Sequence, residues 1–237
     1  MRWLPWVQRS VEPAKALDGT APPGSITGCT ATPLDEVPML LSRRLVLATA
    51  LATPLLARAE TADPRMTERT VGTADAPVTV TEWFSLTCTH CADFQKTTFP
   101  QVKAELIDTG KIRYIWRDFP LDQVALTAAM VARALPPERY EPFISALLGS
   151  QDRWAFARGV NSTEELAKLA GLAGLPRANF NTVIADQDLR QAILTGQSEA
   201  ETTFKVQSTP SFIMNGKLTS GAVSYPNFVK AVADAAG

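Results

Sequence analysis

The feature that most constrains the fold of this chain is a pair of cysteines, Cys88 and Cys91, at the point where a strand pattern gives way to a helix pattern. Residues 76–84 are rich in β-branched and aromatic side chains and predict a buried strand. Residues 88–109 carry an apolar stripe at helical spacing and end before a glycine, which predicts a helix. Residues 112–116 again have a strand pattern. The unit strand, helix, strand implies parallel strands with a right-handed crossover.

The remainder of the chain divides into a helical block and a second small sheet unit. Residues 121–206 show helical periodicity throughout, broken into several short helices, one of them opened by a capping box at 162–165. Residues 211–220 predict a β-hairpin around Asn215-Gly216. Residues 226–236 predict a closing helix. The expected fold is therefore α/β, with an all-helical block inserted between a βαβ half and a ββα half.

Composition excludes several classes of function. With 23 basic and 24 acidic side chains, the net charge of -1 provides no positive field for a nucleic-acid partner. The single histidine, His90, would have to serve any Ser-His-Asp site, and a four-ligand zinc site would need the distant Cys29. A haem attachment motif fails because Ala92 follows the second cysteine. We expect no metal and no bound cofactor.

The first 59 residues have the pattern of a processed leader. Residues 1–38 hold six of the 17 prolines without a sustained hydrophobic period, and we expect them to be disordered or an untranslated extension upstream of a start at Met39. Residues 39–59 combine a short basic region, an apolar run and the small-x-small sequence Ala57-Arg58-Ala59 of a cleavage site. Sec and twin-arginine export both fit this signal. The mature chain is expected to span 60–237 outside the cytoplasm, where its two cysteines form a disulfide.

The spacing of the two cysteines favours redox chemistry. In the first turn of a helix, residues three apart share a face, so the two sulfurs come within bonding distance. Cys88 at the helix N-terminus meets unpaired N–H groups that stabilise a thiolate, and His90 adds a donor or a charge. Cys88 is then the nucleophile and Cys91 the resolving thiol. An inert surface disulfide and a metal-binding hairpin stay open as alternatives, although a bridge over so short a loop is a poor staple.

The motif Cys-x-His-Cys, together with Thr209-Pro210-Ser211-Phe212 before the hairpin, resembles the DsbA family of thioredoxin-fold disulfide oxidoreductases over residues 71–237. The resemblance implies a thioredoxin fold with a helical insertion at about 121–206. It also implies that Pro210 is cis and lies beside the catalytic sulfurs, and that the backbone of Thr209 pairs with substrate. Thr89, at a substrate-binding position, stands where a proline is common in that family.

Glu82 is a further candidate, six residues before Cys88. It shares its strand face with apolar side chains, so its pKa should be raised and it is placed to exchange a proton with Cys91. Family members often carry an acid here. A glutamate paired with a lysine, or one at a wet strand end, is the alternative.

The resulting functional hypothesis is a periplasmic thiol oxidase that donates its Cys88–Cys91 disulfide to reduced exported polypeptides. The resemblance implies reoxidation by a membrane partner of the quinone-linked DsbB type, and nothing in the sequence requires more than a monomer. A reductase or isomerase is an alternative, although family isomerases carry an added N-terminal dimerisation domain and residues 60–75 are too few for one. A peptide-binding module with a structural disulfide is another.

Overall fold

The computed structural model describes residues 63–237. The predicted extension 1–38, the predicted signal 39–59 and Cys29 lie outside the described residues. Within residues 63–237, no helix combines the length and the apolar character that crossing a bilayer requires.

The described residues are built on a five-stranded mixed sheet with the strand order β1-β3-β2-β4-β5. The strands are β1 Arg69–Val71, β2 Val78–Phe84, β3 Ile112–Asp118, β4 Ser211–Met214 and β5 Lys217–Ser220. Strands β2 and β3 are parallel, as the sequence predicts, and β4 pairs antiparallel with both β2 and β5. The edge strand β1, antiparallel to β3, was not predicted, because three residues are too few to show an alternating pattern.

Helices follow the sheet in both halves and fill the interval between them. They are α1 Thr89–Thr97, α2 Phe99–Val102, α3 Gln123–Ala134, α4 Pro137–Leu148, α5 Gln151–Trp154, α6 Ser162–Leu172, α7 Arg177–Ala185, α8 Gln187–Thr202 and α9 Tyr225–Ala236, with a 3-10 turn η1 at Pro64–Met66 and a π-helical turn η2 at Lys103–Ile107. The predicted helical insertion is thus α3 to α8, and the expected α/β thioredoxin fold with its inserted helical block is confirmed.

Two predicted details of the helices were wrong, and one short helix was not predicted. The helix predicted over 88–109 is interrupted at Thr98, because Pro100 lacks the N–H that a continuous helix would use and its ring would clash with the carbonyl four residues earlier. The capping residue of α6 is Asn161 rather than Ser162, since its side chain accepts from the first-turn N–H groups. The short helix α5 has no pattern of its own in the sequence.

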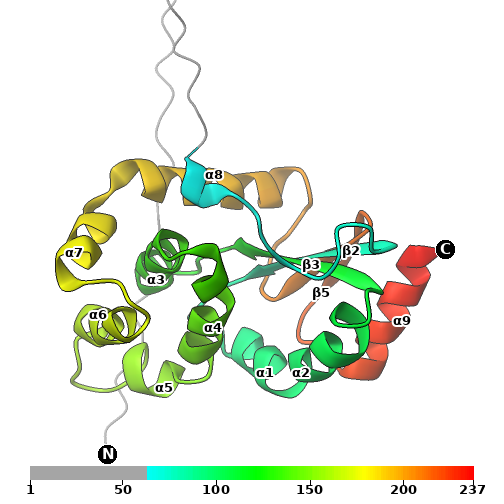
Figure 1. The fold of residues 1–237 in the computed structure, drawn as a ribbon, viewed down its shortest axis with the longest axis horizontal. Helices are drawn as coiled ribbons and strands as arrows, with labels where there is room; N and C mark the ends of the chain where they lie inside the picture. The colour runs from blue at the N-terminus through cyan, green and yellow to red at the C-terminus, as the bar shows by residue number, and fades with distance from the viewer. Residues whose placement is uncertain (1–62) are drawn as a thin grey trace, which may run out of the picture. The chain divides into compact units, whose positions relative to one another are not determined.

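The two faces of the sheet carry different clusters (Figure 1). One face packs against α1, α2 and α9, and contains a cluster of aromatic rings: Phe94, Phe99, Tyr114, Trp116, Phe212 and Phe228. The opposite face, covered by α8, has a smaller cluster of Trp83, Phe119, Ala200, Val206 and Ile213. Strand β2 is buried along the first face, and on the face toward α8 it is half-buried at Thr79 and Thr81 and buried at Trp83, which fits its almost continuous β-branched and aromatic sequence.

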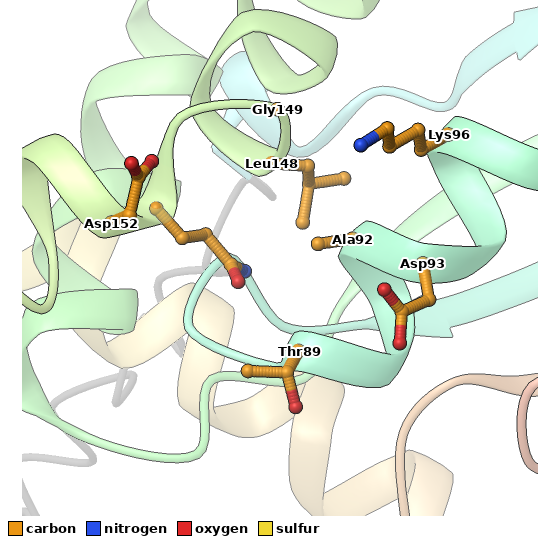
Figure 2. A pocket seen from close by; sticks show the side chains of 8 residues that line it. Thr89, Ala92, Asp93, Lys96, Leu148, Gly149 and Asp152 are labelled. Atoms are coloured by element: carbon orange, nitrogen blue, oxygen red, sulfur yellow. The ribbon is translucent and has the colours of Figure 1, made fainter.

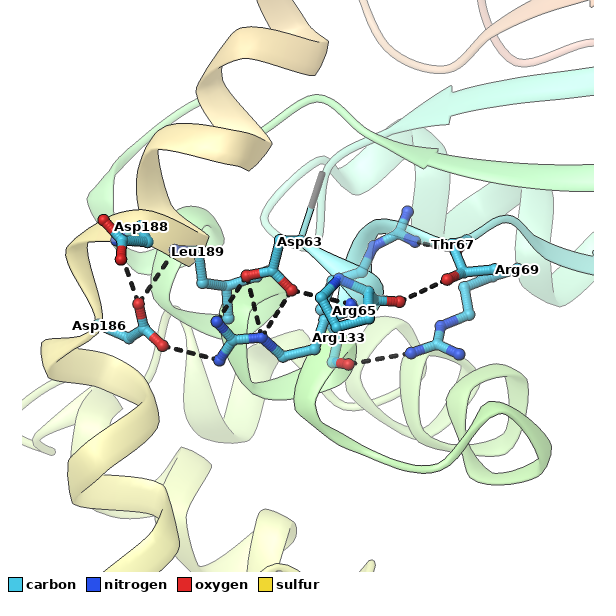
Figure 3. A network of polar contacts seen from close by, with 9 residues as sticks. Asp63, Arg65, Thr67, Arg69, Arg133, Asp186, Asp188 and Leu189 are labelled. Atoms are coloured by element: carbon cyan, nitrogen blue, oxygen red, sulfur yellow. Dashed lines mark hydrogen bonds and ion pairs between the residues drawn. The ribbon is translucent and has the colours of Figure 1, made fainter. Parts of the chain in front are cut away.

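Polar contacts fasten the segment before the sheet to the insertion (Figure 3). The Arg65 guanidinium forms ion pairs with Asp63 and with Asp186, the residue that caps α8. Arg133 of α3 donates to the carbonyl of Thr67 at 3.0 Å. Residues far apart in the chain are thereby joined beside the core.

Candidate active site

The two cysteines lie at the start of α1, where strand β2 leads into the helix. Cys88 is the N-cap residue of α1, and its Sγ accepts from the N–H of Cys91 at 3.3 Å. Its carbonyl accepts from the N–H of Ala92 at 3.1 Å, the first bond of the helix. Both residues are thiols in this structure; Cys88 is 6% exposed and Cys91 is fully buried. The placement predicted from the spacing is confirmed.

The loop before β4 lies against the Cys88 sulfur. The Thr209–Pro210 peptide bond is cis, as the resemblance implied. The Cys88 thiol donates to the carbonyl of Thr209 at 3.3 Å, across 121 residues of chain. The Thr209 hydroxyl is buried without a hydrogen-bond partner among the described residues. An unpaired buried donor is costly, and the Thr209 side chain is one of the groups that lower the pKa of the neighbouring Cys88 thiol.

These contacts separate the acidities of the two thiols. The pKa of Cys88 is lowered to about 5, mainly by the hydrogen bond from the Cys91 thiol and further by the Thr209 side chain and the N–H groups of His90 and Cys91. The pKa of Cys91 is raised, chiefly by its burial and then by its bond to Cys88 and the charge of Glu82. At neutral pH the pair therefore holds one thiolate, on Cys88, and one proton, on Cys91.

Glu82 lies in the middle of β2 on the face that packs against α1. It is 2% exposed, and the Tyr114 hydroxyl donates to its Oε2 at 2.8 Å. Burial raises the pKa of Glu82 to about 8, the Tyr114 bond opposes this rise, and the charge of Cys88 adds to it. Neither a lysine partner nor a wet strand end, the two alternatives for this carboxyl, describes its surroundings.

The other predicted site residues are at the surface. His90 and Thr89 in the first turn of α1 are exposed, and His90 contributes its backbone N–H to the Cys88 sulfur. Thr89 borders a pocket between α1 and the α4–α5 corner, whose other lining includes Ala92, Leu148 and Gln151 (Figure 2). In the described part of the chain, no cluster of three or more metal-ligating side chains occurs.

The sequence analysis missed two residues that contact the site but lie far from it in the sequence. Tyr114 on β3, which holds Glu82, has the pattern of an ordinary core aromatic. Gln151 of α5 donates to the carbonyls of Leu86 and Cys88, and no local sequence signal marks it. Only the strand register and the packing of the insertion bring these side chains to the site.

Replacing Glu82 by glutamine is expected to change how stability depends on pH. The pKa of about 8 in the folded protein exceeds the ordinary 4.5. The buried carboxyl therefore contributes stability that is full below about pH 4.5 and is lost as pH rises through about 8, by up to about 1.4 kcal/mol per pH unit. Cys88, with a depressed pKa, has the opposite slope in the dithiol form. Cys88 titrates in both native protein and Glu82→Gln. The difference between their unfolding free energies therefore reports the contribution of the Glu82 carboxyl.

Urea unfolding of the dithiol proteins across this pH range measures that difference, with Glu199→Gln on exposed α8 as the matched control. In the control, the stability difference from native protein should not vary with pH. If the difference between native protein and Glu82→Gln is equally constant with pH, the assignment of a buried protonated carboxyl is wrong.

Comparison with known proteins agrees with this architecture. A family model described as thioredoxin matches residues 65–234. The solved structure of alpha-DsbA1 from Wolbachia pipientis is 30% identical, with a TM-score of 0.66, over 73% of this chain and 92% of that one. BdbD from Bacillus subtilis, at 18% identity and a TM-score of 0.63 over 71% of this chain and 92% of its own, shares the fold.

The curated relatives from Rickettsia are longer proteins. A Rickettsia prowazekii protein with the provisional name protein-disulfide oxidoreductase RP025 is 32% identical over 163 residues, 68% of this chain and 59% of the relative. This chain thus spans less than two thirds of that protein. The fold and the paired cysteines define a thioredoxin-fold protein with two thiols at the start of its first helix. The chain belongs to the thioredoxin family, in its DsbA-like group of disulfide oxidoreductases.

Proposed function

We propose that this protein is a periplasmic thiol oxidase, which transfers the Cys88–Cys91 disulfide to reduced exported polypeptides. The observation that carries the proposal is the unequal acidity of the two thiols: the pKa of Cys88 is lowered to about 5, and that of Cys91 is raised. A stabilised thiolate favours the dithiol form, and a stable dithiol form makes the disulfide a strong oxidant.

The exchange begins with a substrate thiolate attacking Cys88 Sγ in the disulfide form. The Cys88–Cys91 bond breaks, a mixed disulfide forms at Cys88, and Cys91 leaves as a thiolate that takes a proton from Glu82. A second substrate thiolate then attacks the substrate sulfur and releases the Cys88 thiolate. The substrate loses two electrons to form its disulfide, and the protein gains them as a dithiol. Glu82 recovers its proton from solvent.

The buried Cys91 thiol favours completion of this exchange. A thiol whose pKa is raised is rarely a thiolate, so it returns slowly to attack the mixed disulfide. The second substrate thiol then has time to react. Thr209 and Pro210 lie next to the Cys88 sulfur, where an extended substrate segment can pair with the Thr209 backbone. Reoxidation by a DsbB-type quinone-linked membrane protein and a monomeric state belong to the same proposal.

Export rests on the pattern of residues 39–59. If the signal is cleaved, the native protein isolated from cells begins at Glu60. N-terminal sequencing of that protein checks the cleavage site, and any peptide from residues 1–38 refutes the start at Met39.

The direction of the reaction is tested by the redox equilibrium with glutathione, measured together with the thermal stability of both forms. A Cys29→Ser background leaves the Cys88–Cys91 pair as the reporter. We expect the equilibrium to lie toward the dithiol and the dithiol form to melt at the higher temperature. A more stable disulfide form with a reducing equilibrium would instead indicate a reductase or a structural bridge.

A further inference from the structure

The turn that carries Cys88 is bonded to the helical insertion by a buried glutamine. Gln151, the first residue of α5, is 6% exposed. Its Nε2 donates to the carbonyl of Leu86 at 2.9 Å and to that of Cys88 at 3.0 Å. A carboxamide nitrogen has two N–H groups, so each carbonyl receives its own proton. The two accepting residues flank Thr87, and the side chain therefore spans the turn between β2 and α1.

A second contact reaches the same turn from the start of α3. Asp122 caps this helix through Oδ1, which accepts from the N–H of Ala125 at 2.8 Å. Its Oδ2 accepts from the hydroxyl of Thr87 at 2.7 Å. The Ser85 hydroxyl oxygen also accepts from the N–H of Leu121 at 3.3 Å. The insertion thus holds the turn at its backbone through α5 and at its side chains through the α3 end.

We propose that Gln151 and Asp122 are positioning residues, through which the helical insertion fixes the orientation of the Cys88 sulfur at the N-terminus of α1. The Cys88 carbonyl that Gln151 binds also accepts the first helical bond, from Ala92. Holding this carbonyl fixes the backbone of the capping residue and keeps Sγ in line with the N–H of Cys91. Hydrogen bonds weaken steeply as their angle degrades, so a looser turn stabilises the thiolate less.

The charged groups around α1 are not altered when Gln151 or Thr87 is replaced. A pocket separates part of α1 from residues 148–152 at the surface (Figure 2). Asp93, Lys96 and Asp152 border this pocket, and Glu82 and His90 are the charged or titratable groups nearest the cysteines within β2 and α1. Gln151 and Thr87 are neutral. Replacing either by an apolar residue leaves every one of these charges in place.

The test compares Gln151→Met, which keeps the length of the side chain without its donors, with Gln191→Met on the exposed face of α8 as the matched control. Each variant is made in the full chain with Cys29→Ser and studied as the dithiol. Ultraviolet absorbance of the thiolate measures the Cys88 pKa, iodoacetamide measures thiolate reactivity at about pH 4, and urea measures stability. We expect Gln151→Met to raise the Cys88 pKa by about one unit, which lowers the thiolate fraction at this pH by about ninefold, and therefore to slow alkylation several-fold. We expect Gln191→Met to change neither.

A loss of stability with a Cys88 pKa equal to that of the control overturns the proposal, because it shows a purely structural role. If Gln151→Met does not fold, Thr87→Val decides. This variant is nearly isosteric and removes the bond to Asp122 together with the 3.3 Å hydroxyl contact to Ser85. An unchanged Cys88 pKa in Thr87→Val then overturns the proposal. The inference rests on the proposed function only in taking Cys88 as the reactive thiol. If the native protein has no acidic thiol, the proposed function is wrong. If the native protein has an acidic Cys88 and the variants have the same Cys88 pKa, only this inference is wrong.

Discussion

Cys88→Ser is expected to abolish disulfide exchange, lowering insulin-thiol turnover by roughly three orders of magnitude or more, the scale of losing a nucleophile. The serine hydroxyl is neither acidic enough to ionise at this position nor able to form a disulfide. The assay follows transfer of the Cys88–Cys91 disulfide to a reduced peptide. Peptide affinity measured in parallel separates the oxidase from a peptide-binding module with a structural disulfide. In such a module, Cys88→Ser would lose stability but keep its peptide affinity, and the native protein would show no disulfide transfer.

The partner cysteine offers a matched pair of variants. Cys91→Ser and Cys91→Ala both remove the resolving thiol. When the Cys88 thiolate of either variant attacks a disulfide-bonded peptide, one peptide thiolate leaves, and the mixed disulfide at Cys88 is expected to accumulate. Only the serine retains a donor for the Cys88 sulfur. Because the Cys91 thiol is the main cause of the lowered Cys88 pKa, this pKa should be higher in Cys91→Ala than in Cys91→Ser. Equal values in the two variants would contradict that cause.

Arg133→Met is expected to destabilise the protein by about 3–5 kcal/mol, the usual cost of leaving one member of a buried ion pair alone. The Arg133 Nε lies 2.6 Å from Asp118 Oδ2, with both side chains almost completely buried. The same guanidinium donates to the backbone of Thr67, and the Tyr140 hydroxyl donates to Asp118 Oδ1. Without Arg133, the buried Asp118 carboxylate keeps the Tyr140 hydroxyl as a donor but loses its ion-pair partner.

Chemical unfolding of two further variants gives this prediction its controls. Arg177→Met breaks the Glu164–Arg177 pair, whose members are about half exposed, and should leave stability unchanged because solvent screens such pairs. Adding Asp118→Leu to Arg133→Met removes the stranded charge and should restore part of the loss. Equal losses for Arg133→Met and Arg177→Met would show that burial of the pair does not matter.

Local patterns were enough to predict where Cys88, Cys91 and Glu82 lie within their own elements. The three-residue spacing of Cys88 and Cys91 at a strand-to-helix junction already determines which sulfur caps the helix. Alternation along residues 78–84 likewise placed Glu82 on the face beneath α1. Both predictions depend on neighbours within one element, where geometry follows directly from the sequence.

Local patterns could not predict contacts between residues that are far apart in the sequence. Tyr114 meets Glu82 only because parallel pairing sets Val80 opposite Tyr114 and Glu82 opposite Trp116, a register that no single strand specifies. Gln151 sits in a four-residue helix without periodicity, and its two acceptors belong to a turn more than 60 residues earlier. The interruption at Thr98, in contrast, was predictable in principle from Pro100.

The position of β4 in the sheet has a consequence for the order in which the protein folds. Strand β2 pairs with β3, which follows it closely in the chain, but also with β4, near the C-terminus. Closing so long a loop is slow relative to local pairing. A chain still emerging during synthesis therefore carries Cys88 without its contact to Thr209. Because the Thr209 side chain contributes to the lowered Cys88 pKa, part of the acidity of this thiol appears only once β4 has docked.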